Sequence, residues 1–136
     1  MKKLISLFAM VILMTGIVVA QSNTTTTTQE GNDNNANVEQ IGQNNDATVL
    51  QKKKDWNYTN PESRVSNLNK AIIEQRGNGN DAFIQQAGQY NDAKVDVDGH
   101  WNQIIAEQSI WGAGGNHALN LKVDGNSNVA NLTQDV

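Results

Sequence analysis

The segment 38–51 alternates polar and apolar positions in an unusual way. Every second residue from Asn45 to Gln51 faces the same side of a strand, and that side holds two amides, an alanine and a valine. The inner face of a half-buried strand normally carries apolar side chains only. The inner face here is therefore expected to contain amides that need hydrogen-bonding partners inside the protein.

The same arrangement recurs along the chain at fixed offsets. Counting a glutamine as place 0, glycine follows at place 2, asparagine at place 5, alanine at place 7, a branched apolar residue at place 9 and glutamine again at place 11. Glycine and asparagine tolerate positive φ and predict a tight arc, whereas the period-two half predicts a strand. Two units per coil predict an all-β fold, a parallel β-solenoid with two facing sheets, about 22 residues per coil and roughly four coils.

Stacked coils explain the inward amides, because equivalent residues lie about 4.8 Å apart and can bond the copies above and below. The expected amide ladders are formed by Gln40, Gln51, Gln75, Gln86, Gln108 and Gln134, and by Asn34, Asn45, Asn69, Asn80, Asn91, Asn102, Asn116 and Asn128. The expected core consists of Ala36, Ala47, Ala71, Ala82, Ala93, Ala130, Val38, Val49, Ile73, Ile84, Val95 and Leu132. If alternate units belong to opposite sheets, one place-11 column holds only glutamine, and the other changes from Gln40 and Gln75 to Val97 and Val123.

Residues 1–20 have the layout of a secretory signal peptide, with Lys2 and Lys3 before an apolar stretch and small residues before Gln21. A retained transmembrane anchor, the alternative, needs about 20 apolar residues. The run here is shorter and is interrupted by Ser6, Thr15 and Gly16. The expected organisation is therefore a signal peptide at 1–20, a polar segment at 21–28 and a repeat domain at 29–134 with an insertion at 52–68.

Composition and charge limit the kinds of partner and of stabilisation that the chain is expected to have. Richness in asparagine, glutamine and glycine alone would indicate disorder, but the fixed order of the positions argues against it. Of 10 basic and 14 acidic residues, removal of Lys2 and Lys3 leaves eight basic ones and a net charge of -6, which disfavours a nucleic-acid partner. The chain has no cysteine, so disulfides do not stabilise it.

With these motifs the chain resembles the curlin-repeat proteins, the subunits of curli amyloid fibres, over roughly residues 29–134. The resemblance implies a secreted subunit that passes through a dedicated outer-membrane pore, folds outside the cell and polymerises into biofilm matrix beside a partner curli subunit. In that family the polar stretch after the signal peptide addresses the chain to its pore, and residues 21–28 occupy this place, with an unstructured tail as the alternative. The insertion, the enlarged arc near residues 109–115 and the valines at place 11 favour a minor or nucleating subunit over the major one.

Place 10 is expected to face outward, and in one sheet it holds the acids Glu39, Glu74 and Asp96, about one rung apart. Like charges at this distance repel by about 1 kcal/mol in water. We expect these acids to raise one another's pKa values, so that assembly is faster at mildly acidic pH. The alternative is that they only keep the surface soluble.

No motif predicts a catalytic, cofactor or metal site. Asp96, Asp98 and His100 alternate, but a calcium-binding β-roll repeats its aspartate turns about every nine residues, and this chain does not. Neither His100 nor His117 lies beside a serine in a recognisable motif. We expect a structural protein rather than an enzyme, with itself as the main partner.

Aromatic residues suggest an alternative function. They are expected in the insertion and the arcs, where they pack on neighbouring turns or contact a ligand: Trp56, Tyr58, Trp101 and Trp111. A monomeric β-solenoid adhesin that binds polysaccharide or a host ligand is therefore the second candidate. An ice-binding solenoid is disfavoured, because Thr48 and Thr133 occupy different places and the threonine tract precedes the repeats.

Overall fold

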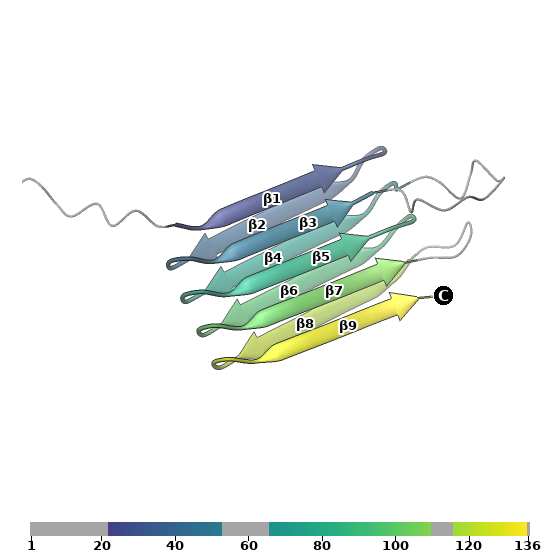
Figure 1. Ribbon diagram of the computed structural model, residues 1–136. Coiled ribbons are helices and arrows are strands. Elements are labelled where there is room, and N and C mark those ends of the chain that lie inside the picture. The colour runs from purple at the N-terminus through teal and green to yellow at the C-terminus, as the bar shows by residue number, and fades with distance from the viewer. Residues whose placement is uncertain (1–21, 53–65, 110–115, 136) are drawn as a thin grey trace, which may run out of the picture.

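The computed structural model describes residues 22–52, 66–109 and 116–135, and within them the chain forms β-strands and no helix. The strands are β1 (Thr24–Gln29), β2 (Asn35–Ile41), β3 (Asp46–Gln51), β4 (Lys70–Arg76), β5 (Asp81–Gln86), β6 (Asp92–Asp98), β7 (Gln103–Ser109), β8 (Ala118–Asp124) and β9 (Val129–Asp135). Successive strands alternate between two facing sheets (Figure 1). The predicted parallel β-solenoid is confirmed.

Each sheet collects every second strand of the chain. The odd sheet has the order β1-β3-β5-β7-β9 and the even sheet has the order β2-β4-β6-β8. All neighbours within a sheet run parallel and in register, as in the pair Gln86 and Gln108. Equivalent residues of successive coils therefore lie directly beside one another, and a two-unit coil is confirmed.

The core lies between the two sheets and follows the period-two pattern. The alanines at place 7 and the branched residues at place 9 point inward on the central strands, and place-11 glutamines continue the same inner face. Alternating outward residues are only partly covered on these strands. The small side chain at place 7 leaves room for the opposite sheet to pack closely.

The arcs differ in one respect from the expectation. Positive φ occurs at the place-2 glycines, for example 111° at Gly77, and at place 4, where it is 56° at Asn44 and 59° at Trp101. The place-5 asparagines do not adopt positive φ, with the exception of Asn116. Their role in the arc is instead to hydrogen-bond its backbone, because their side chains turn into the solenoid.

The repeat boundaries also need correction. Thr24–Gln29 forms the first strand of the odd sheet, so the solenoid begins before residue 29 and includes most of the predicted polar segment. Lys52 and residues 66–68 belong to a normal arc, since the Lys52 N–H donates to Gln86 O and Asn67 bridges to Gln89. The insertion is thus confined to residues 53–65, which lie outside the described residues.

The predicted signal peptide also lies outside the described residues. Among those that are described, no helix has the length and hydropathy to cross a membrane.

Candidate functional site

An unbroken glutamine ladder runs through the odd sheet. Each Nε2 donates to the Oε1 of the next rung, from Gln29 through Gln51, Gln86 and Gln108 to Gln134, at 2.8, 2.8, 2.9 and 3.0 Å. Gln51, Gln86 and Gln108 are fully buried. Each of these Nε2 atoms also donates to a backbone carbonyl of the even sheet, as from Gln86 to Lys70 O at 2.8 Å. The ladder therefore satisfies buried amides and ties the two sheets together.

The even sheet carries a shorter ladder. Gln40 Nε2 donates to Gln75 Oε1 at 2.9 Å, and the column then continues with Val97 and Val123. Gln75 Nε2 donates in turn to the backbone carbonyl of Asp46 at 2.9 Å. Gln75 is the last glutamine of this column and faces Val97. Its side-chain amide is still not left without a partner, because it bonds to Asp46 O and to Gln40.

The asparagines of the odd sheet form a second ladder at the arcs. The Nδ2 atoms of Asn80, Asn102 and Asn128 donate to the Oδ1 of the preceding rung at 3.2, 3.1 and 3.0 Å, beginning at Asn45. The same Nδ2 atoms of Asn45, Asn80 and Asn102 reach the carbonyl of the next place-2 glycine, between 2.7 and 2.9 Å. These side chains hold one arc against the next.

On the other edge the asparagine ladder is incomplete. The Oδ1 atoms of Asn34 and Asn69 accept backbone N–H groups of the next rung at 3.1 and 3.0 Å, but no side-chain amides bond to each other. Asn91 Oδ1 is buried without a hydrogen-bond partner in the described part of the chain. His117, not Asn116, follows Asn91 in this column, and its backbone N–H does not repeat the bond that Asn69 and Asn91 make to the preceding rung. The prediction that Asn116 belongs to the ladder is wrong, because the register places His117 beside Asn91 and leaves Asn116 exposed with φ of 89°.

Most predicted core residues are buried between the sheets. Exposure is 0% for Ala47, Ala71, Ala82, Ala93, Val49, Ile73, Ile84 and Val95. Ala36, Val38 and Ala130 are partly buried against this cluster. Leu132 differs from the prediction, because it is 38% exposed. It points inward from β9, but the even sheet has no described strand beyond β8 to cover it.

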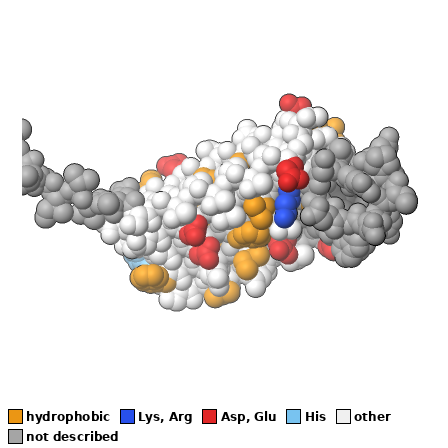
Figure 2. Space-filling model, turned by 45° about the horizontal axis from the view of Figure 1, so that its top comes forward, with side chains coloured by type: hydrophobic (Ala, Val, Ile, Leu, Met, Phe, Trp, Pro, Cys, Tyr) orange, Lys and Arg blue, Asp and Glu red, His pale blue; other side chains and the backbone are white. Residues whose placement is uncertain are grey.

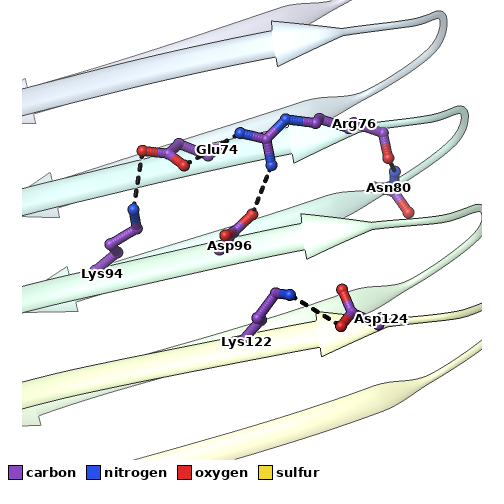
Figure 3. A network of polar contacts seen from close by, with 7 residues as sticks. All are labelled: Glu74, Arg76, Asn80, Lys94, Asp96, Lys122 and Asp124. Atoms are coloured by element: carbon purple, nitrogen blue, oxygen red, sulfur yellow. Dashed lines mark hydrogen bonds and ion pairs between the residues drawn. The ribbon is translucent and has the colours of Figure 1, made fainter.

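Two cations, Arg76 and Lys94, lie beside the acids of the expected acidic row. Lys94 Nζ lies 3.0 Å from Glu74, and Arg76 lies 3.4 Å from Glu74 and 3.0 Å from Asp96 (Figure 3). The Lys94 hydrogen bond is the main cause that holds the pKa of Glu74 below its ordinary value of 4.5. The expectation that these acids raise one another's pKa values is therefore wrong for Glu74, because ion pairs outweigh the repulsion.

This arrangement predicts the pH dependence of stability. A carboxylate whose pKa is lowered by folding stabilises the fold above its unfolded value, and this contribution is lost as pH falls through the lower folded pKa. We expect Glu74→Gln to lower the urea unfolding midpoint of the dilute monomer at pH 7, with a difference from the wild type that shrinks as pH falls below 4.5, and the wild-type midpoint to be flat between pH 5 and 8. Urea is preferable to guanidinium, because salt screens ion pairs.

Glu39→Gln is the matched control, since Glu39 lies in the same column and forms no ion pair among the described residues. A midpoint that rises on acidification from pH 8 to pH 5 would contradict the ion-pair account and restore the repulsive one.

The two ends of the solenoid differ in chemistry. β1 carries threonines at the inward places, and all six of its residues are exposed. β9 presents Leu132 and the ladder residue Gln134, whose Nε2 makes the usual backbone bond, to Ala118 O, at 3.4 Å. Both strands leave an unpaired edge in the described structure, and an unpaired strand edge is a template for another chain.

The exposed aromatic side chains give little support to a ligand-binding surface. Trp101 is 67% exposed, but its ring packs over Gly79, where an added Cβ would lie 2.4 Å from a ring carbon. Tyr90 is exposed on the opposite edge, so the two rings do not form one platform. Trp56, Tyr58 and Trp111 lie outside the described residues. Figure 2 shows one face on which charged side chains are few and scattered.

No group of three or more histidine, aspartate or glutamate side chains within the described residues is placed to hold a metal ion. Asp96, one of the three residues of the alternating motif, pairs with Arg76 instead.

The odd ladder contains one residue beyond the expected ladder positions. Gln29 belongs to the odd ladder and lies 22 residues before Gln51, which is the coil length, so its spacing was a usable signal. Asn23 also occupies an arc position, since its Oδ1 accepts the Asn45 N–H at 3.0 Å.

Comparison with protein families identifies the repeats. The family model described as the curlin associated repeat matches residues 20–52 and 67–96. These two matches cover β1 to β3 and most of β4 to β6, and the gap between them contains the insertion. Comparison with curated proteins and with solved structures gave no match. The chain is a member of the curlin-repeat family.

Proposed function

We propose that the chain is a secreted structural subunit that assembles head-to-tail into curli-type amyloid fibres of the biofilm matrix, where it serves adhesion. The observation that carries this proposal is the terminal strand β9, which presents the same inward pattern of two apolar residues and a glutamine as the interior strands, with no further strand beside it among the described residues. Ala130, Leu132 and Gln134 fall in the columns of Ile104, Ala106 and Gln108. An uncovered rung that repeats the interior pattern is complementary to another copy of the chain.

The direction of the ladder supports head-to-tail rather than head-to-head contact. Every bond of the odd ladder runs from Nε2 to the Oε1 of the next rung, so one end presents donors and the other presents acceptors. Two copies stacked in the same orientation continue this series, whereas two opposed copies bring like groups together. A head-to-tail contact does not close on itself and gives a fibre.

Family membership supports the finer parts of the proposal, which are export by way of the periplasm and an outer-membrane pore and assembly beside a partner curli subunit. The valines of the even column and the enlarged arcs favour a minor or nucleating rank. Residues 1–20 serve as the signal peptide in this proposal. Recognition by the pore is assigned to the polar residues that follow, which also enter β1.

The decisive experiment is assembly of the purified mature chain, residues 21–136, followed by thioflavin fluorescence, electron microscopy and fibre diffraction. We expect unbranched fibres with a meridional reflection at about 4.8 Å. A monomer that stays soluble under all assembly conditions would contradict the proposal. It would favour the adhesin alternative, for which the exposed ring of Trp101 is the one supporting observation.

A further inference from the structure

We propose that β1 is a displaceable cap, and that β9 of a second copy takes its place against β3 when two copies join. This inference rests on the proposed head-to-tail assembly. It concerns what happens to the first strand at each junction, and it makes release of that strand a step of fibre growth.

The side chains of β1 suit a cap rather than an interior strand. Thr25 and Thr27 occupy inward places that hold apolar residues in all four remaining strands of the odd sheet, β3, β5, β7 and β9. Thr25 Oγ1 donates to Gln40 Oε1 at 2.9 Å, and Gln40 Nε2 donates to Thr24 O at 3.1 Å. A polar strand thus satisfies the first even-sheet glutamine and protects the apolar edge of the solenoid.

The number of strands in each sheet creates a conflict at a junction. Among the described strands, five lie in the odd sheet and four in the even sheet. When β2 of a second copy pairs with β8 of the first, the odd-sheet position beside that β2 is already occupied by β9. In the free copy this same position, beside β2, is occupied by its own β1. Only one of the two strands can lie there.

The alternative junction keeps both strands but breaks the even sheet. If β9 pairs with β1 of the next copy, β8 and the next β2 are separated by one vacant strand position, about 9.6 Å between strand axes instead of about 4.8 Å. The backbone groups along both facing edges would then lack sheet partners. Displacement of β1 keeps both sheets continuous through the junction.

The register shows that β9 fits against β3. Both β1 and β9 hold the same columns, so Ala130, Leu132 and Gln134 would replace Thr25, Thr27 and Gln29 over the inner face of β3. This exchange covers Leu132, which is 38% exposed in the free chain. Asn128 would take the place of Asn23, with its Nδ2 directed to the carbonyl of Gly42, the bond that Asn23 makes at 3.1 Å.

The exchange also has a cost that explains why β1 stays in place in the monomer. Ala130 has no hydroxyl to replace Thr25 Oγ1, and the next residue of the even column is Val123, so Gln40 Oε1 loses its donor. A buried acceptor without a donor is unfavourable. The cap is therefore stable alone and gives way only when the apolar side chains of β9 are supplied.

Cross-linking in mixed fibres tests the junction directly, because the chain has no cysteine. The outward column contains Thr26, Thr48, Phe83, Ile105 and Asn131 in that order. Neighbours in a parallel sheet lie about 4.8 Å apart, within the range of about 4.4–6.8 Å that suits a disulfide. Fibres grown from equal parts of N131C and T48C chains are expected to form a disulfide between the two variants on mild oxidation.

Two further mixtures make the outcome specific. N131C with T26C reports the retained-cap junction and should give no mixed disulfide, and N131C with F83C should give none because Phe83 lies in an interior strand. Fibres that link N131C to T26C, or that lack the N131C–T48C link, overturn the inference and leave the proposed function intact. Absence of fibres from the wild-type chain overturns the proposed function itself.

A reversible lock tests whether cap release limits growth. The double variant T26C/T48C joins β1 to β3 within one chain, and we expect its oxidised monomer to lose fibre growth and to regain it on reduction. The double variant T48C/F83C, which joins two interior strands, is the control and should grow in both states. Growth of the oxidised T26C/T48C chain at the rate of its reduced form would overturn the inference.

Discussion

Replacing Gln86 by leucine is expected to lower the free energy of unfolding of the dilute monomer by about 3 kcal/mol. Gln86 is fully buried and receives a bond from Gln51 and donates one to Gln108. Leucine has a similar size but leaves a donor on one rung and an acceptor on the other without their partners, each at a cost of about 1–3 kcal/mol. A total of about 3 kcal/mol corresponds to about a hundredfold change in the ratio of folded to unfolded monomer.

The measurement is the free energy of unfolding of the dilute monomer in urea. Gln85→Leu is the matched control, because Gln85 is the adjacent residue and lies on the outward side of the same strand. Equal free energies of unfolding for Gln86→Leu and Gln85→Leu would show that the ladder does not stabilise the fold. The even column gives a natural comparison, because there Val97 and Val123 replace the amide on successive rungs together.

Gly77→Ala is expected to prevent closure of its coil and to lower the urea midpoint of the dilute monomer more than backbone strain alone would. The added Cβ would lie 1.9 Å from Gly99 O, in the next arc, at a φ of 111°. Strain of a non-glycine residue at such a φ costs about 1–3 kcal/mol. Collision with a backbone carbonyl adds to it, because the stacked arcs cannot move apart without breaking the sheets.

Gly125→Ala separates the two effects. Gly125 has a similar φ of 114°, but the nearest atom to its added Cβ is Asn128 Nδ2 at 3.3 Å, because no described arc lies beyond it. We expect the Gly125→Ala monomer to be less destabilised than the Gly77→Ala monomer and yet to fail in fibre growth, where the next copy covers this arc. Equal urea midpoints for the two variants would contradict the stacked-arc account.

The sequence predicted the fold well at positions where a buried polar side chain can be hydrogen-bonded in only one arrangement. A buried glutamine needs a partner at every rung, so the place-11 spacing indicates both the coil and the assignment of Val97 and Val123 to one column. The arcs carry a weaker signal. Place 4 has positive φ whichever residue stands there, including Trp101 and Leu68, because the tight coil imposes this conformation on its own residues.

The ends of the solenoid were the hardest part to predict. β1 shares only its last ladder position, Gln29, with the interior pattern, because a terminal strand has one neighbour and no need for apolar inward residues. Leu132 follows the pattern but is exposed, because burial depends on the next coil and not on the residue. The ion pair of Glu74 with Lys94 joins β4 to β6 and follows from the register of neighbouring strands, whereas Arg76 lies two residues after Glu74 on β4, a spacing that the sequence shows.

Solid-state NMR of fibres in which labelled chains are diluted into unlabelled chains tests the central claim, that equivalent rungs of one chain stack on each other. Gln86 and Gln108 are neighbours within one molecule, with Nε2 and Oε1 2.9 Å apart. The contact between their side-chain amides is expected to persist unchanged on dilution. Its loss on dilution, or a contact between Gln86 residues of different chains in its place, would show that the fibre is not built from solenoids.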